Sequence, residues 1–346
     1  MNVRDFDRDL SFFTEVLGMR AVGEGSDGLT GSARQALTGS ALPRLFDLAP
    51  GASVDFRSQL VAPEGDDGAF YEVFQWISPA SPDDEWYAPS NHVGLFRSQM
   101  QVVGYDDLKR KIAASDRAEF INSEVRWAGA IAPNDPPSYT RAGSIRHDSG
   151  AVFQIKQAEN AELDALPGRS AKINHRAIHT RDIEASFRFY TEVFGVQLQT
   201  EWGPQGHLEM LTATSVSPQY VHYLTEYQVP QIFGIDQAKT PVTNFDSGFL
   251  TVQGVNGGAQ NLDFFQWLTP RAVGEPYSST IHLGLQRLSF FVEDFDDVKS
   301  RVATRARRVI AEEVALPDVF LPGVDRAASR AMSLLDPDGV FLLVLG

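Results

Sequence analysis

The chain has 346 residues, no cysteine and a formal net charge of −15 at pH 7. Its length suits two hydrophobic cores, the lack of cysteine excludes disulfides, thiolate nucleophiles and cysteine-bound metals, and the acidic balance argues against nucleic acid as a partner. No apolar run approaches the roughly 18 residues that span a membrane, and no basic leader precedes the first helical pattern, so we expect no membrane partner and predict a cytoplasmic protein.

The first predicted element is an amphipathic helix over 5–17, with Gly18 as its C-cap. A shorter helix is expected over 106–113, because aspartate is a favourable N-cap. Both helices return in the second half of the chain, over 182–194 and over 296–302. Runs of β-branched and aromatic residues predict strands, among them 177–180, 220–224, 262–268, 288–292 and 340–345.

Several short motifs occur twice in the same order. Each first copy and its second copy are 5–18 and 182–195, 74–76 and 265–267, 91–97 and 281–287, and 105–109 and 295–299. Such repeats determine the architecture. They predict an α+β fold of four βαβββ modules in two tandem halves, 1–157 and 173–346, with a polar linker over 158–172. The modules are expected at about 1–85, 90–157, 173–270 and 280–346, and the opening strand of the first is incomplete.

Three segments carry a family resemblance. Residues 175–196 resemble the opening strand and helix of the vicinal oxygen chelate superfamily, which includes glyoxalase I, extradiol dioxygenases and the bleomycin-resistance proteins. Residues 336–339 (DPDG) resemble its closing turn, with 147–150 a weaker echo, and Glu72 and Asp263 resemble the acids of its fourth strand. The resemblance implies mixed, curved sheets that pair to form cup-shaped cavities.

In this superfamily a cup usually holds a divalent metal through a first-strand histidine, a fourth-strand acid and two ligands from the partner module. In the second half of this chain, these four positions fall on His175, Asp263, Arg287 and Leu343. In the first half, the histidine position has no residue, and the other three positions fall on Glu72, Arg97 and Gln154. Arginine offers no lone pair, and a catalytic site needs about three protein ligands. We therefore predict no metal and no other cofactor. A register slip of one residue would restore a metal site with His282, so a divalent metal remains the alternative.

The acid and the arginine of each half have two compatible interpretations. Glu72 with Arg97, and Asp263 with Arg287, could form buried salt bridges in place of the metal, or the arginines could bind an anionic ligand. The usual pKa of a histidine lies near neutral pH, so His175 is a candidate general base beside Asp263. We prefer the second half as the working site and expect the loss of Arg287 to weaken binding more than the loss of Arg97.

Period-two alternation extends the candidate ligand-binding set, because alternate residues of a strand share a face. His179 shares the face of His175, and odd spacing places His92 and His282 opposite their arginines, which favours structural roles for both. The remaining predicted binding residues, which share the faces of Asp263 and Glu72, are Phe265, Trp267, Phe74 and Trp76.

These features favour a lyase- or isomerase-type enzyme that acts on a small anionic or aromatic metabolite without the usual metal. Two alternatives stay open: a non-catalytic protein that binds a drug or metabolite, and a divalent-metal-dependent enzyme like glyoxalase or an extradiol dioxygenase. The expected partner is a small-molecule ligand. A homodimer is compatible with the sequence.

Overall fold

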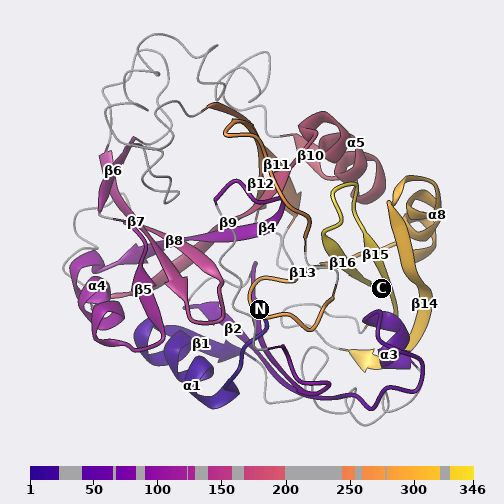
Figure 1. Cartoon of the computed structure of the whole chain (residues 1–346), viewed down its shortest axis with the longest axis horizontal. Helices are drawn as coiled ribbons and strands as arrows, with labels where there is room; N and C mark the ends of the chain where they lie inside the picture. Colours follow the sequence, from indigo (N-terminus) through magenta and orange to yellow (C-terminus); the bar gives the residue numbers. More distant parts are fainter. Residues whose placement is uncertain are drawn as a thin grey trace.

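The computed structural model consists mostly of strands with few helices (Figure 1). It describes residues 1–22, 41–64, 68–82, 90–122, 124–128, 139–157, 167–198, 244–253, 259–276, 279–319 and 328–346. None of the helices in these ranges is long and apolar enough to cross a membrane. The predicted strand at 220–224 lies outside the described residues.

The described elements follow the four repeats, which we number modules 1 to 4 in chain order. Module 1 contains α1 (Phe6–Ser11), the π-helix η1 (Phe12–Val16), β1 (Met19–Val22), α3 (Ala41–Leu45), β2 (Asp55–Pro63) and β3 (Tyr71–Ser78). Module 2 contains β4 (Gly94–Val103), α4 (Tyr105–Ala114), β5 (Ala118–Phe120), β6 (Val125–Ala128), β7 (Tyr139–His147) and β8 (Val152–Gln157). Module 3 contains β9 (Arg169–Thr180), α5 (Ile183–Phe194), β10 (Gln197–Leu198), β11 (Asn244–Gln253) and β12 (Ala259–Thr269). Module 4 contains β13 (Arg287–Phe291), α8 (Phe295–Arg305), β14 (Arg308–Val319), β15 (Ala328–Leu335) and β16 (Phe341–Leu345).

Local sequence signals explain where the helices begin and end. Asp182 is the N-cap of α5, and its side chain accepts a hydrogen bond from the backbone N–H of Ala185. Gly195 ends α5 with a left-handed φ of 68°, which glycine adopts without strain. Helix α8 begins earlier than predicted because Asp294 is its N-cap. The helix predicted over 5–17 starts as α1 and continues as η1.

The sheets join modules from different halves of the chain. Modules 2 and 3 form one nine-stranded sheet of order β10-β11-β12-β9-β4-β8-β7-β5, in which β6 also pairs with β7. At its centre, β4 from the first half pairs antiparallel with β9 from the second. Module 1 forms the sheet β1-β2-β3, and module 4 forms the sheet β13-β16-β15-β14.

Asn2 connects the sheets of modules 1 and 4. It bridges Phe74 of β3 in parallel and Gly284, just before β13, in antiparallel fashion. In module 3, His179 pairs in the same two ways, parallel with β12 and antiparallel with β4. Module 1 therefore pairs with module 4 as module 3 pairs with module 2, so each pairing crosses between the two halves.

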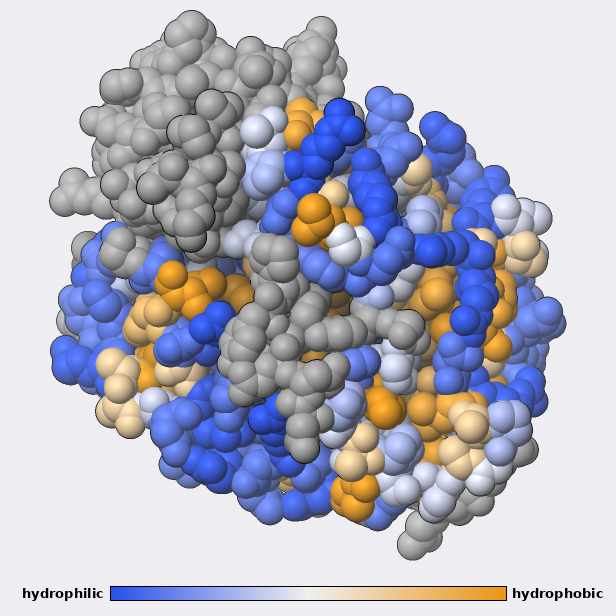
Figure 2. Space-filling model, in the orientation of Figure 1, coloured by the Kyte–Doolittle hydropathy of each residue, from blue (hydrophilic) through white to orange (hydrophobic). Residues whose placement is uncertain are grey.

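One face of the nine-stranded sheet packs against helices in a large apolar core. Alternate residues of its strands supply that face, among them Met100, Phe153, Ile155, Ile178, Leu262 and Phe264. The residues between them point to the opposite side of the sheet. The outer surface visible in Figure 2 is mainly hydrophilic with small apolar patches, because the large apolar side chains lie in internal clusters.

Candidate functional site

The side of the nine-stranded sheet that faces away from the helices carries buried polar residues. We call it the polar face and define it by Arg97, Gln99, Gln154, His175 and Asp263, each at most 4% exposed. Gln154 of β8 pairs with Gln99 of β4, and Gln99 pairs with His175 of β9. Polar side chains are rarely buried together without a functional or structural reason, so this face is the candidate site.

A β-bulge in β4 positions the arginine of the polar face. Leu95 pairs with Ile178, whereas the next residue to pair is Arg97, which lies opposite Ala177. Phe96 is therefore an extra residue in β4, and such bulges redirect the side chains beside them. On the other side of β9, Ala177 pairs with Asp263 of β12. The small alanine thus separates the arginine from the acid, and both can reach over it.

Arg97 and His175 converge on one carboxylate oxygen. Arg97 Nη2 donates a hydrogen bond to Asp263 Oδ2 at 3.3 Å, and His175 Nε2 lies 3.3 Å from the same oxygen. All three side chains are at least 94% buried. A cation, an imidazole and a carboxylate therefore meet on the polar face.

Burial determines the protonation of these groups. Burial lowers the pKa of Arg97 to about 10, although the charge of Asp263 raises it, so the guanidinium remains protonated at neutral pH. Burial, and then the charge of Arg97, holds the pKa of His175 well below its usual value of 6.5. The imidazole is therefore neutral at pH 7 and able to accept a proton.

Aromatic rings surround this cluster. The guanidinium of Arg97 lies 4.8 Å from the ring centroid of Phe265, and Phe249 approaches His175 edge-on with 5.4 Å between centroids. His179, a predicted ligand contact, stacks on Phe96 at 4.6 Å. The Nδ1 atom of His179 accepts a hydrogen bond of 3.2 Å from the indole N–H of Trp267. His179 and Trp267 thus engage each other at the end of the polar face.

The equivalent face of modules 1 and 4 is packed with apolar side chains. Its aromatic residues belong to an apolar cluster into which α3 and the residue after it insert Leu42, Leu45 and Phe46. Phe46 contacts Trp76 edge-on, with 5.1 Å between their centroids. Phe74, which we predicted to line a ligand site, is fully buried in this cluster. The structure brings Phe74 and Trp76 together as core residues.

Glu72 and Arg287 pair beside the aromatic rings of this packed face. Arg287 Nη2 donates to Glu72 Oε2, and Ser58 Oγ donates to Glu72 Oε1 at 3.0 Å. The Arg287 guanidinium also lies 4.5 Å from the ring centroid of Phe74. This pair corresponds to Arg97 and Asp263 in the other module pair.

The predicted pairings within each half are therefore wrong. The structure pairs Arg97 with Asp263 and Arg287 with Glu72, because each sheet is built from modules of both halves. The arginine beside His175 is Arg97, and our expectation that Arg287 contributes more to the same site does not follow from the structure.

The parity argument for His92 and His282 also fails in part. The bulge at Phe96 shifts the alternation of β4, so an odd spacing no longer places His92 and Arg97 on opposite faces. The structure places His92 outside β4, with its Nδ1 atom 2.8 Å from the carbonyl of Val93. His282 lies before β13, and its carbonyl accepts a hydrogen bond of 2.7 Å from the side chain of Asn2. It is therefore joined to module 1 and not to the sheet of His175.

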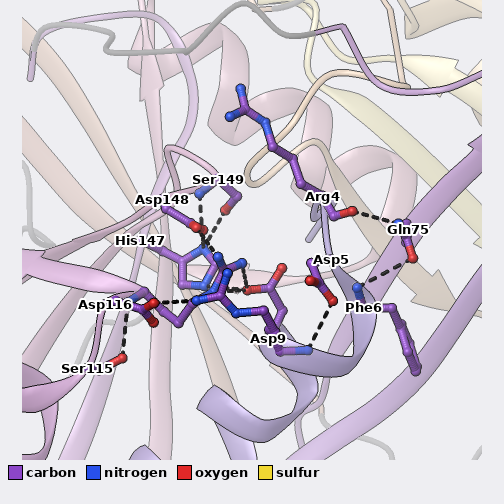
Figure 3. Close-up of polar contacts among 12 residues, drawn as sticks. Arg4, Asp5, Phe6, Asp9, Gln75, Ser115, Asp116, His147, Asp148 and Ser149 are labelled. Atoms are coloured by element: carbon purple, nitrogen blue, oxygen red, sulfur yellow. Dashed lines mark hydrogen bonds and ion pairs between the residues drawn. The ribbon is translucent and has the colours of Figure 1, made fainter.

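Among the described residues, one group combines three side chains whose types and spacing could hold a metal: Asp9, His147 and Asp148. Figure 3 shows Asp9 of α1 facing His147, the last residue of β7, and Asp148, which follows it. Arg117 already pairs with both carboxylates. Burial alone would raise the pKa of Asp9, but hydrogen bonds from His147 and Arg117 hold it below its usual value. A guanidinium thus supplies the positive charge that this cluster requires.

The family model Glyoxalase/Bleomycin resistance protein/Dioxygenase superfamily matches residues 172–343. The chain belongs to this superfamily. The fold agrees: glyoxalase I from Zea mays aligns with a TM-score of 0.53 and 12% identity over 99% of this chain and 89% of that chain. A putative dioxygenase from Bacillus subtilis aligns with a TM-score of 0.51 and 10% identity over 99% of this chain and 82% of that chain. Curated protein sequences give no match. At these identities the two structures support the superfamily fold alone.

The divalent metal implied by the superfamily resemblance does not fit the polar face. His175, Asp263 and Gln154 offer donor atoms, but Asp263 Oδ2, the oxygen nearest His175, is contacted by the guanidinium of Arg97. A metal ion at that oxygen would be repelled by the nearby positive charge of Arg97, and burial strengthens this repulsion because the local dielectric is low. Arg97 therefore stands where a metal would need to bind.

Sequence reasoning missed two contributors to the polar face. Gln99 has no chemical motif, and its neighbour His175 is distant in sequence. Phe249 lies in β11, a strand that the sequence analysis did not predict. The repeat alignment did contain a signal for the strand pairing. Asn2 aligns with His179, so the two residues are expected to pair with equivalent strands, as they do.

Proposed function

We propose that this superfamily member binds a small anionic metabolite with an aromatic or other apolar part on the polar face and transfers a proton on it, as a lyase- or isomerase-type enzyme without a metal. The convergence of Arg97 and His175 on Asp263 Oδ2, each at 3.3 Å, supports the proposal. A permanent cation, a neutral base and an orienting carboxylate lie together, which is what proton abstraction beside a carbonyl or carboxylate requires.

Arg97 holds the negative charge of the substrate in this mechanism. It remains protonated, because its pKa of about 10 lies well above neutrality. A planar guanidinium suits a carboxylate or an enolate oxygen. On a buried face its charge acts through a lower dielectric than in water, so the charge that develops during proton abstraction is stabilised.

His175 moves the proton. The carboxylate of Asp263 beside Nε2 favours the tautomer with hydrogen on that atom and leaves a lone pair on Nδ1. Nδ1 takes a proton from the substrate carbon next to the anionic group, and the electron pair of the broken C–H bond passes to the oxygen near Arg97. The imidazolium then returns the proton to another substrate atom in an isomerase, or to the leaving group in a lyase.

The aromatic contacts also favour a second candidate, a protein that binds the same ligand without turnover. Phe265 and Phe249 lie against Arg97 and His175, so a flat ligand could bind between rings and guanidinium. The variant His175→Gln separates the two candidates. An enzyme loses turnover and keeps affinity, whereas a sequestering protein has no turnover to lose.

A thermal-shift screen tests the proposal with small aromatic and aliphatic carboxylates and phosphate esters, each with and without divalent ions. A ligand that prefers the native state raises the melting temperature. Arg97→Gln should abolish the shift that an acid gives, while the matched variant Arg287→Gln should keep it. Equal responses of the two variants, or a stoichiometric divalent ion in protein purified without chelator, would contradict the proposal.

A further inference from the structure

The polar face contains a buried amide that has no hydrogen-bond partner among the described residues. Gln154 of β8 is 1% exposed, and both its side-chain nitrogen and its side-chain oxygen lack a partner there. Buried polar groups are almost always hydrogen-bonded, because an unsatisfied donor or acceptor loses its contact with water and gains nothing in return. An amide without a hydrogen-bond partner at this position is expected to lower the stability of the free protein.

The strand alternation directs this amide to the polar face. Its neighbours Phe153 and Ile155 belong to the apolar core under the helices, so Gln154 points to the other side of β8. Gln154 pairs with Gln99, which pairs with His175. Two strand spacings of nearly 5 Å place the backbones of Gln154 and His175 about 10 Å apart, a span that one small metabolite can bridge.

The packed face of modules 1 and 4 provides an internal comparison. Leu343 occupies the position of Gln154, since each lies four residues after the glycine of its turn. Leu343 pairs with Ser289 as Gln154 pairs with Gln99. Where Phe46 and its neighbours fill the face, this position is a leucine in an apolar cluster. Where the face is polar, it is an amide without a described partner.

We infer that Gln154 is a specificity-determining residue that forms hydrogen bonds with a ligand group able both to donate and to accept, such as a hydroxyl or a primary amide, on the side of the ligand away from the anion at Arg97. The inference rests on the proposed binding of an anion at Arg97, and it does not depend on catalysis. The ligand satisfies an amide that no described residue satisfies, so selectivity is gained at the expense of the stability of the free protein.

The test uses Gln154→Leu and, as matched control, Gln99→Leu. Gln99 is a neighbouring buried glutamine whose side-chain oxygen accepts a hydrogen bond of 2.7 Å from Asn174. Without ligand, Gln154→Leu should raise the melting temperature, because it replaces an unsatisfied amide with hydrocarbon of similar volume. Gln99→Leu should lower it, because Asn174 loses its acceptor. A lower melting temperature for Gln154→Leu would overturn the inference.

Calorimetric titrations with benzoate and its 2-, 3- and 4-hydroxy derivatives test the ligand side. At least one hydroxybenzoate should bind the wild type about tenfold more tightly than benzoate, as one good buried hydrogen bond allows. That preference should disappear in Gln154→Leu while benzoate affinity stays unchanged. Acids that bind through Arg97 with no preference dependent on Gln154 would overturn this inference alone. If no acid binds the wild type, the proposed function fails and this inference fails with it.

Discussion

Arg97 and Asp263 form a buried ion pair, with 3.3 Å between Nη2 and Oδ2, although 166 positions separate them in the sequence. Glu72 and Arg287 form the equivalent pair across 215 positions. Each pair takes its arginine and its acid from different halves of the chain. Both faces, the polar one and the packed one, are therefore assembled by the two halves together.

The first prediction concerns the carboxylate at the centre of the polar face. Asp263→Ala should lower the free energy of unfolding by about 3–5 kcal/mol, because it leaves a guanidinium buried without its counter-charge. Urea unfolding at neutral pH measures the loss. Asp297→Ala, which breaks an exposed pair with Arg301, is the control and should change stability little. Equal effects of the two substitutions would show that Arg97 is not buried against Asp263.

The second prediction concerns acid sensitivity. The folded state excludes the proton from His175, since burial holds its pKa well below 6.5, while the unfolded chain binds that proton below about pH 6.5. This stability contribution is present above pH 6.5 and is lost as the pH falls. His175→Gln should therefore reduce the slope of unfolding free energy against pH between 6.5 and 5 by up to about 1.4 kcal/mol per pH unit. An unchanged slope would mean that His175 is accessible to protons in the folded state.

The third prediction separates the two faces. Phe46→Ala should destabilise the protein by about 3–5 kcal/mol, because Phe46 is fully buried in the cluster that fills the face of modules 1 and 4. It should leave the binding of acids at Arg97 unchanged. Phe249→Ala, beside His175, should instead weaken binding. If Phe46→Ala lost acid binding but kept its stability, the ligand would bind at the face of modules 1 and 4 and not at the polar face.

The fourth prediction concerns the contact between α1 and the end of β7 (Figure 3). Asp9 has a lowered pKa, so it contributes stability above the unfolded value of about 3.8, and this contribution is lost as the pH falls below it. Asp9→Asn should reduce stability at pH 7, because Arg117 and His147 lose a buried anion. The free energy of unfolding of this variant should also fall less steeply than that of the wild type as the pH decreases below about 3.8. Equal acid unfolding of wild type and variant, followed by circular dichroism, would contradict this role.

Much of the fold was predictable, because it rests on local signals and on repetition. The helix over 182–194 was indicated by apolar residues at helical spacing and by Asp182 and Gly195 at its ends, and the structure shows those caps. The superfamily was predictable for a related reason, since its motifs lie in the segments that form the first strand, the helix and the closing turn of a module.

The candidate site was predictable as a set of residues but not as an arrangement. Sequence positions identified Arg97, His175 and Asp263 separately, since each matches a position of the family motif. Their association depends on which modules share a sheet, and adjacency along the chain favours the wrong partner. The bulge at Phe96 was not predictable either, because nearly every residue of β4 is buried and its sequence shows no clear alternation that an extra residue would interrupt.

A double-mutant cycle tests the central claim, that the polar face is assembled across the halves, most directly. Urea unfolding of Arg97→Met, Asp263→Leu and the double variant gives the coupling energy of that pair, and the same cycle with Glu72→Leu gives that of the pair within the first half. We predict a coupling above about 1 kcal/mol for Arg97 with Asp263, and one within about 0.5 kcal/mol of zero for Arg97 with Glu72. Strong coupling of Arg97 to Glu72, with none to Asp263, would contradict the account.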